Sequence, residues 1–257
     1  MAISVGMEEA FRLREVFSKS FNAFGRHVVV FLMLSAIAHI PSLSLSLWEF
    51  TWVRDARVLL RWMVLVDQLT FVVGFVCVVI AYGTIIHGVV EDLAGRRVSI
   101  AAAVAIAVRR LLPLVGVSAA ALLLSRLGMG LVSPAFIVLS TYWVVTLMFF
   151  MVAPVCIAER VGVGAALSRC RFLTKGHRWQ ILVTVLLLGT IGRAIEVAWG
   201  AAVGGAWGAA VGGQRAIVAF YGIWVVFGAF NAVMAAVFYD RLRFAKDGAH
   251  YFAKIFD

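Results

Sequence analysis

The chain has 257 residues, of which 63% are hydrophobic and only 14% are charged, and its mean hydropathy is +1.01. A soluble domain of this length could not bury so much apolar surface, so the composition excludes a soluble globular protein and predicts an integral membrane protein. The net charge of +10 would suggest nucleic acid as the partner of a soluble protein, but in a membrane protein we expect it to reflect topology and anionic lipid headgroups.

Several apolar runs are long enough to cross a membrane as helices. A helix needs roughly 18 apolar residues to cross a hydrocarbon core of about 30 Å, and long continuous runs favour helices over the short alternating strands of an outer-membrane barrel. The sequence therefore predicts an all-α membrane protein with six transmembrane helices in a single integral membrane domain of residues 1–257. The predicted spans cover residues 28–48, 62–90, 111–131, 135–157, 179–199 and 215–239.

The N-terminal segment is predicted to lie at the membrane interface. Its acidic residues come before its basic ones, and no short apolar core with a cleavage site follows, so we expect the first span to act as an uncleaved anchor. Residues 9–26 place polar residues at steps of three and four, opposite a face of leucine and phenylalanine. This spacing is typical of an amphipathic interfacial helix.

Two later segments share this design. Residues 163–178 show the same spacing of polar and apolar positions, and residues 98–110 form a degenerate third copy that ends in two arginines. Each unit would consist of an amphipathic interfacial helix, a basic turn and a transmembrane hairpin. The possible repeats are residues 9–92, 96–157 and 162–245.

The distribution of lysine and arginine predicts the orientation of the chain. On the predicted topology, seventeen of the 23 basic residues fall on the side that holds both termini, so the positive-inside rule places the termini in the cytoplasm. Basic residues beside the interfacial helices are our candidates for binding anionic lipid headgroups. They are Lys19, Arg26, Arg109, Arg110, Arg169, Arg171, Lys175, His177 and Arg178.

The stretch FLTKGHRW, residues 172–179, has two interpretations. Its basic residues and histidine, with Cys170 just upstream, could form a reactive site. Its similarity to FNAFGRH at residues 21–27 favours a basic turn at which an interfacial helix leads into a span, with Trp179 as an interfacial anchor. We prefer the second interpretation.

Cysteine and histidine usage does not predict a chemical site. The three cysteines lie in or beside apolar segments, which is typical of buried thiols rather than a disulfide framework. No two histidines are spaced with a carboxylate as a helical zinc site requires, and His87 with Glu91 suits a capping or interfacial role better than metal binding. We expect no metal, no cofactor and no catalytic residue.

Polar residues inside the predicted spans support an alternative hypothesis, because charges in hydrocarbon are costly and usually face a cavity or a partner. An outward-facing cavity lined by Asp67, Arg193 and Glu196 would suit a small transporter, whereas the same side chains could instead extend to the interface. His39 could bond a backbone carbonyl freed by Pro41. The full set of intramembrane candidates is His39, Asp67, Gln68, Arg126, Arg193 and Glu196.

Glycine recurs at every fourth position near the end of the fifth span. On a helix this spacing makes a flat stripe suited to close helix packing or to an oligomer interface, and the alternative is a loop between two spans. The residues are Gly200, Gly204, Gly208 and Gly212.

Residues 81–103, 153–179 and 237–248 resemble a bacterial inner-membrane family. That family includes the membrane domain of membrane-anchored glycerophosphoryl diester phosphodiesterases. The resemblance implies the fold and the location of the chain. It does not imply phosphodiesterase activity, because in those proteins the hydrolase is a separate soluble domain, and only a short tail follows the last predicted span here.

These observations predict a non-enzymatic protein of the bacterial inner membrane. It would interact with lipids or serve as an accessory or organising subunit of a membrane complex. A small transporter or lipid-moving protein is the alternative, and an integral-membrane lipid enzyme is the third hypothesis. The expected partners are membrane lipids, anionic on the cytoplasmic face, together with a membrane-protein partner or a second copy of the chain; nucleic acid is not expected.

Overall fold

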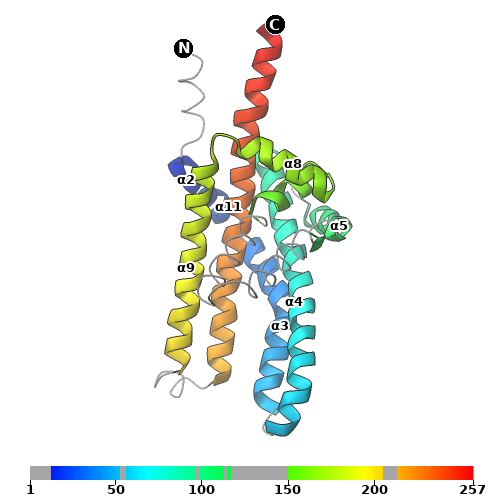
Figure 1. Ribbon diagram of the computed structural model, residues 1–257, viewed down its shortest axis with the longest axis vertical. Coiled ribbons are helices and arrows are strands. Elements are labelled where there is room, and N and C mark those ends of the chain that lie inside the picture. The colour runs from blue at the N-terminus through cyan, green and yellow to red at the C-terminus, as the bar shows by residue number, and fades with distance from the viewer. Residues whose placement is uncertain are drawn as a thin grey trace, which may run out of the picture.

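The structure is a computed structural model, and it describes residues 13–52, 56–96, 99–112, 115–116, 150–204 and 213–256. These residues form helices and no strand, which confirms the predicted all-α class. The helices are α2 (Leu13–Arg26), α3 (Val28–Trp52), α4 (Ala56–Leu93), α5 (Ile100–Arg109), α8 (Val163–Thr174), α9 (Arg178–Gly204) and α11 (Gly213–Phe256). Figure 1 shows α3, α4, α9 and α11 as long upright rods, with the three short helices gathered towards one end.

Four helices are long and apolar enough to cross a membrane, and they overlap with four of the six predicted spans. The stretches that meet this description, which we call the membrane-crossing stretches, are Val28–Trp48, Val72–Leu93, Trp179–Trp199 and Gly213–Gly248. A fifth would exist if the helical segment Phe150–Ala158 and α8, which meet at 114°, were one bent span. The predicted span 111–131 and most of the predicted span 135–157 lie outside the described residues, so six spans remain a prediction.

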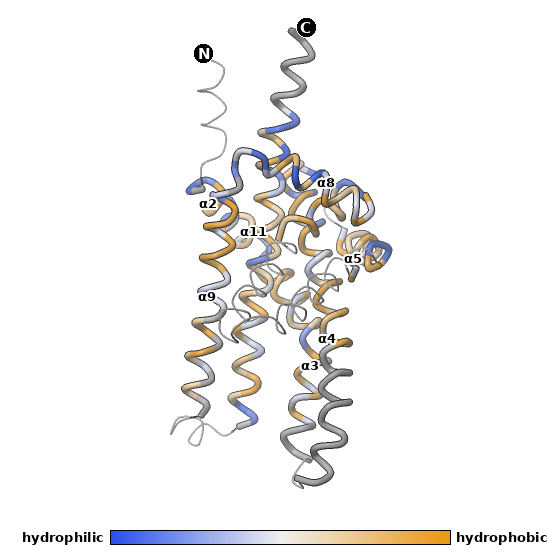
Figure 2. The backbone as a smooth tube through the Cα atoms, in the orientation of Figure 1, coloured by the Kyte–Doolittle hydropathy of each residue, from blue (hydrophilic) through white to orange (hydrophobic). Residues whose placement is uncertain are grey.

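The apolar surface of these helices faces outwards. On α3, exposed apolar residues recur every three or four positions at Val29, Met33, Ile37 and Ile40, and on α9 they recur every four positions, as at Val183 and Leu187. This periodicity places them on one outer face of each helix. Figure 2 shows that apolar residues cover most of the described length of the upright helices, as a hydrocarbon environment requires.

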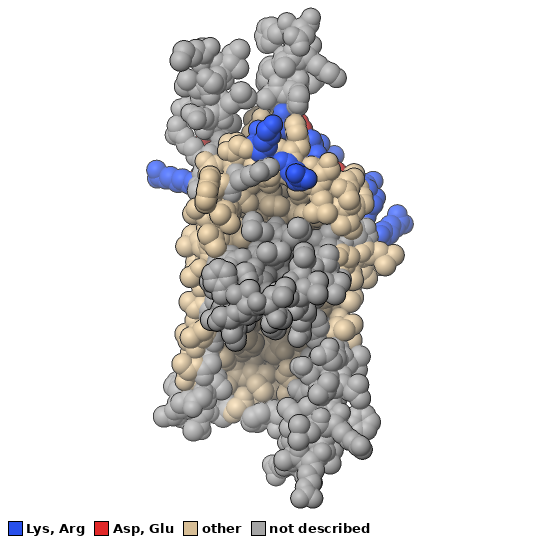
Figure 3. Space-filling view, viewed as in Figure 1, with Lys and Arg blue, Asp and Glu red and all other residues tan. Residues whose placement is uncertain are grey.

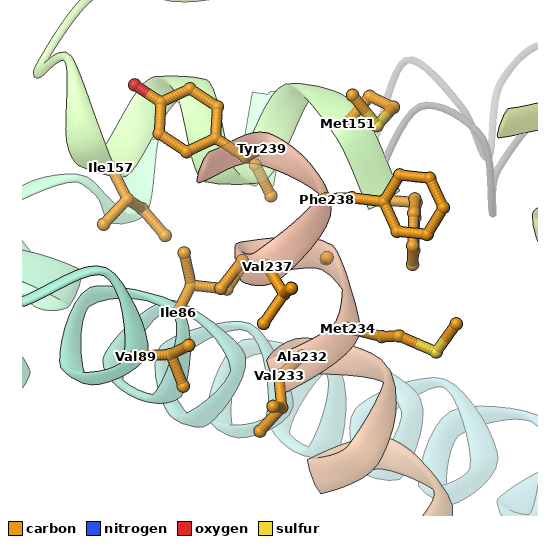
Figure 4. Packing of buried hydrophobic residues seen from close by; sticks show 14 of the residues in the cluster. Ile86, Val89, Met151, Ile157, Ala232, Val233, Met234, Val237, Phe238 and Tyr239 are labelled. Carbon is orange, nitrogen blue, oxygen red and sulfur yellow. The ribbon is translucent and has the colours of Figure 1, made fainter. Parts of the chain in front are cut away.

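The core is built around one stretch of α11. Residues 232–239 of this helix are fully buried, and they include three alanines that allow neighbouring helices to approach closely. Figure 4 shows Ile86 and Val89 of α4 on one side of this stretch, with Met151 and Ile157 of the segment Phe150–Ala158 on another. α11 therefore anchors both α4 and the segment that leads into α8.

α2, α5 and α8 fall within the three predicted interfacial segments. α2 leads directly into α3 through a break at His27, and α8 leads into α9 through a turn at residues 175–177. The hairpin that would follow α5 lies largely outside the described residues, so the threefold repeat remains a prediction.

The four glycines spaced at every fourth position are only partly described. Gly200 and Gly204 belong to α9, while Gly208 and Gly212 lie outside the described residues.

Candidate functional site

Exposed basic side chains gather at the end of the bundle where the short helices lie. Figure 3 shows lysine and arginine at this end, and Figure 2 shows that hydrophilic residues are concentrated there. We call this region the basic end, and its exposed basic residues are Arg14, Lys19, Arg26, Arg96, Arg109, Arg160, Arg171, Lys175 and Arg243. Arg215, at the start of α11, lies at the opposite end.

The helix α2 has the two faces that an interfacial helix requires. Val16, Ser20 and Ala23 are buried, and the Ser20 hydroxyl donates to the Val16 carbonyl at 2.8 Å. Lys19 and Arg26 are exposed on another face of the helix. α2 therefore holds its charges away from the core while its apolar side packs against the bundle.

Phenylalanine side chains attach α2 to the membrane-crossing helix α11. The ring centroids of Phe21 and Phe24 lie 4.9 and 5.7 Å from that of Phe230 on α11. Phe24 and Phe230 meet edge to face, a favourable aromatic geometry. These rings hold α2 where the basic end meets the apolar part of the bundle.

Two carboxylates at the end of α4 pair with basic side chains at the basic end. Asp92 lies 3.4 Å from Nη2 of Arg26 and 3.3 Å from Nε2 of His27, so it bridges the break between α2 and α3 to α4. The adjacent Glu91 lies 2.6 Å from Nε of Arg96. Arg26 keeps 58% of its side chain exposed in this arrangement, so it is still accessible to a headgroup.

Arg169 of α8 is the most constrained of the headgroup candidates. Its Nε donates to both carboxylate oxygens of Glu159, at 2.9 and 3.2 Å, and its Nη2 donates to both of those of Asp247, at 2.8 and 2.6 Å. The hydrogen bond to Asp247, partly offset by burial, raises the pKa of Arg169. The sequence pattern placed Arg169 among the candidates for binding lipid headgroups, but in the structure its charge is compensated by two carboxylates within the protein.

These bonds hold a sharp bend in the chain. Arg160, between the segment Phe150–Ala158 and α8, has φ 56°, a left-handed conformation that is uncommon for a residue other than glycine. The Tyr239 hydroxyl of α11 donates to Glu159 at 3.1 Å, and Cys170 Sγ donates to the Met151 carbonyl at 3.2 Å. The bend is thus fixed from α11 and from α8.

The stretch FLTKGHRW lies at the turn between α8 and α9, as the topological interpretation expects. Gly176 adopts φ 95° in this turn, a conformation that favours glycine. Lys175 is exposed, and His177 Nδ1 donates to Oε1 of Gln180 at 2.9 Å. Arg178 begins α9, and the structure does not describe its side chain.

The helix α5 presents a third set of basic residues. Ser99 caps its first turn by accepting from the Ala102 amide, and Ala103 and Ala107 form its buried face. Arg109 at its last turn is exposed, and Arg110 just beyond is half-buried. The segment is thus a helix with a buried alanine face and a basic last turn, and its interfacial role remains a prediction.

Polar side chains also line the contact between α3 and α11 within the membrane-crossing stretches. The Ser35 hydroxyl donates to the Val225 carbonyl at 2.9 Å, and Ser46 and Tyr221 share a hydrogen bond of 3.0 Å. His39 Nδ1 donates to the Ser35 carbonyl at 2.8 Å. The carbonyl that Pro41 frees is that of Ile37, four positions earlier, and it was the predicted partner of His39. The observed partner, the Ser35 carbonyl, lies about half a helical turn before it.

The remaining intramembrane candidates are not brought together by anything the structure describes. Asp67 and Gln68 lie in α4, and Arg193 and Glu196 lie in α9, but their side chains are outside the description. Arg126 lies outside the described residues altogether. The outward polar cavity therefore stays a prediction.

Comparisons of the chain with protein-family models, with curated proteins and with solved structures gave no significant match. Within the described ranges, no group of three or more histidine, cysteine and acidic residues could hold a metal ion. The interpretation of the basic end therefore depends on its own geometry.

Proposed function

We propose that this chain is a non-enzymatic membrane protein whose basic end binds the anionic headgroups of lipids in the cytoplasmic leaflet. The observation that carries the proposal is the set of exposed basic residues on α2, α5 and α8, next to helices whose outer faces are apolar. Each lysine or arginine close to an anionic membrane contributes about 1 kcal/mol to the attraction. The bacterial inner membrane is the location that the resemblance of the sequence implies.

The ion pairs at the basic end support a binding role over a catalytic one. Glu159, Asp247 and Asp92 each contact an arginine of another element, and Glu15 of α2 lies 3.4 Å from Arg241 of α11. These carboxylates join helices to one another, so their charges serve to assemble the surface. The exposed lysines and arginines are left as the groups that face the surroundings.

A lipid-selectivity measurement tests this proposal. The full chain is reconstituted in bilayers, and its relative affinity for phosphatidylglycerol over phosphatidylcholine is measured with spin-labelled lipids at low and high salt. Replacing Lys19, Arg26, Arg171 and Lys175 by glutamine should lower the preference for phosphatidylglycerol by about 1 kcal/mol per charge, and salt should weaken it in the unaltered chain.

The control variant is Arg215→Gln, which removes an exposed charge at the opposite end of the bundle. It should change the preference for phosphatidylglycerol less than any single substitution at the basic end, because Arg215 lies far from the other described basic residues. A chain with no preference for phosphatidylglycerol, or one whose preference survives the fourfold substitution, would contradict the proposal.

A further inference from the structure

An apolar groove lies between α9 and α11. Its volume is about 650 Å³, within the range of roughly 300–1,000 Å³ that is typical of small-ligand sites. Phe21 and Phe24 of α2 line it beside Phe230, and residues such as Leu188 and Ile191 of α9 form one wall. Every residue that lines the groove is apolar.

The groove opens on the membrane-facing side of the bundle. Ile191 and Val226, which line it from α9 and α11, are 42% and 49% exposed, and both helices are long and apolar enough to cross a membrane. In a bilayer, a groove in this position would contact lipid hydrocarbon. An unfilled apolar gap would forfeit dispersion contacts along both walls, so a chain-like apolar occupant is favoured over an empty space.

A glycine leaves open space in the lining of the groove. Gly222 lines it from α11, and a Cβ atom added there would meet no other atom within 4 Å. The open space at Gly222 therefore belongs to the groove, and a larger side chain at this position would occupy the space where a ligand lies.

The length of the groove matches one leaflet of a bilayer. Along α11 it extends from Phe230 to Ala219, which at a rise of 1.5 Å per residue is about 16 Å. Half of a hydrocarbon core of about 30 Å is about 15 Å. A single acyl chain aligned with the helices would fill this length.

Charge at the neighbouring end selects the kind of lipid. α2, whose phenylalanines line the groove beside Phe230, carries the exposed Lys19 and Arg26. We infer that the groove holds an acyl chain of an anionic phospholipid whose headgroup lies against these basic residues. This inference rests on the proposed function and adds a defined binding position to it.

Photo-crosslinking in the reconstituted full chain tests the position. Phosphatidylglycerol with a diazirine in one acyl chain is the probe, and phosphatidylcholine with the same diazirine is the comparison lipid. Adducts should concentrate on groove residues such as Ile191 and Ile223 relative to Met33 and Ile37 on the outer face of α3. The phosphatidylglycerol probe should exceed its phosphatidylcholine counterpart in the groove by about fivefold for each basic residue near the headgroup.

A groove-filling variant provides the matched test. Gly222→Phe should abolish the groove adducts and leave those on α3 unchanged, because the new ring occupies the open space. Val183→Phe is the control, since it adds a ring to the exposed outer face of α9 away from the groove lining, and its groove adducts should match those of the unaltered chain. Gel filtration and circular dichroism establish whether each variant is folded. If Gly222→Phe does not fold, the distribution of adducts between the groove and α3 in the unaltered chain tests the inference.

The outcomes separate the inference from the proposed function. Adducts spread evenly over α3 and the groove would overturn the inference, while a preserved preference for phosphatidylglycerol in the selectivity measurement would leave the proposed function standing. Groove adducts that form equally with both probes would overturn the selection of an anionic headgroup. Groove adducts that persist in Gly222→Phe would place the acyl chain elsewhere and would also overturn the inference.

Discussion

Replacing Arg169 by methionine should destabilise the fold, whereas the same change at Arg171 should not. Both arginines belong to α8 and are two residues apart, but Arg169 bonds to Glu159 and Asp247, while Arg171 is exposed. Methionine retains most of the apolar volume of the arginine stem. The comparison therefore isolates the guanidinium group.

The expected magnitude follows from the exposure of each partner. The side chain of Arg169 is 27% exposed and that of Glu159 is 19% exposed. Loss of the ion pair between them removes hydrogen bonds to a mostly buried carboxylate and should cost about 2 kcal/mol. Loss of the ion pair with Asp247 should add only about 0.5 kcal/mol, because Asp247 is 38% exposed and Arg243, 3.5 Å away, still compensates its charge. The total is about 2.5 kcal/mol.

The free energy of unfolding can be measured from tryptophan fluorescence across a denaturant titration in detergent micelles. Arg171→Met should stay within about 0.5 kcal/mol of the unaltered chain, as substitutions at exposed positions usually do. The double variant Arg169→Met with Glu159→Gln should be less destabilised than the sum of the single changes, because no unpaired carboxylate is left. Equal stability of the Arg169→Met and Arg171→Met variants would refute the reasoning.

Two further substitutions test the packing of the membrane-crossing helices. Ser35→Ala removes the hydrogen bond to the Val225 carbonyl. In the same titration it should lower the free energy of unfolding by about 0.6 kcal/mol, an average value for such bonds between membrane helices. Met33→Leu, at a nearby exposed position, serves as its control. Gly74→Ala should cost about 1 kcal/mol, because the new Cβ atom would force the Ser42 hydroxyl on α3 to rotate and would still lie 3.2 Å from Ser42 Cβ, whereas Gly222→Ala, whose Cβ meets open space, should cost much less. Similar stabilities for the two glycine variants would contradict the close approach of α3 and α4 at Gly74.

The membrane-crossing helices are well predicted because their signal is local. Val28–Trp48 and Trp179–Trp199 agree with the bounds expected from sequence, since an uninterrupted apolar run reveals itself without knowledge of its neighbours. The same holds for α2 and α8, where polar residues at steps of three and four mark one face of a helix. The start of α4 differs: the helix begins at Ala56, before the predicted span, because polar residues there are compatible with helix beyond the apolar run.

The partners of individual side chains could not be predicted, because they depend on contacts between distant parts of the chain. Glu159 and Asp247 lie 10 and 78 residues from Arg169, and nothing in the local sequence distinguishes Arg169 from Arg171. The difference arises because α8 turns Arg169 towards α11 after a bend at Arg160. The groove beside Gly222 was missed for the same reason, since its walls come from three helices that are far apart in sequence.

The length of α11 has a mechanical consequence. Its 44 residues make one uninterrupted helix of about 66 Å, roughly twice the thickness of the hydrocarbon core. A tilt of about 10° around the N-terminal end of α11 would displace its C-terminal end by roughly 11 Å. A change in bilayer thickness that tilts α11 would therefore be transmitted to its C-terminal end without any rearrangement within the helix itself.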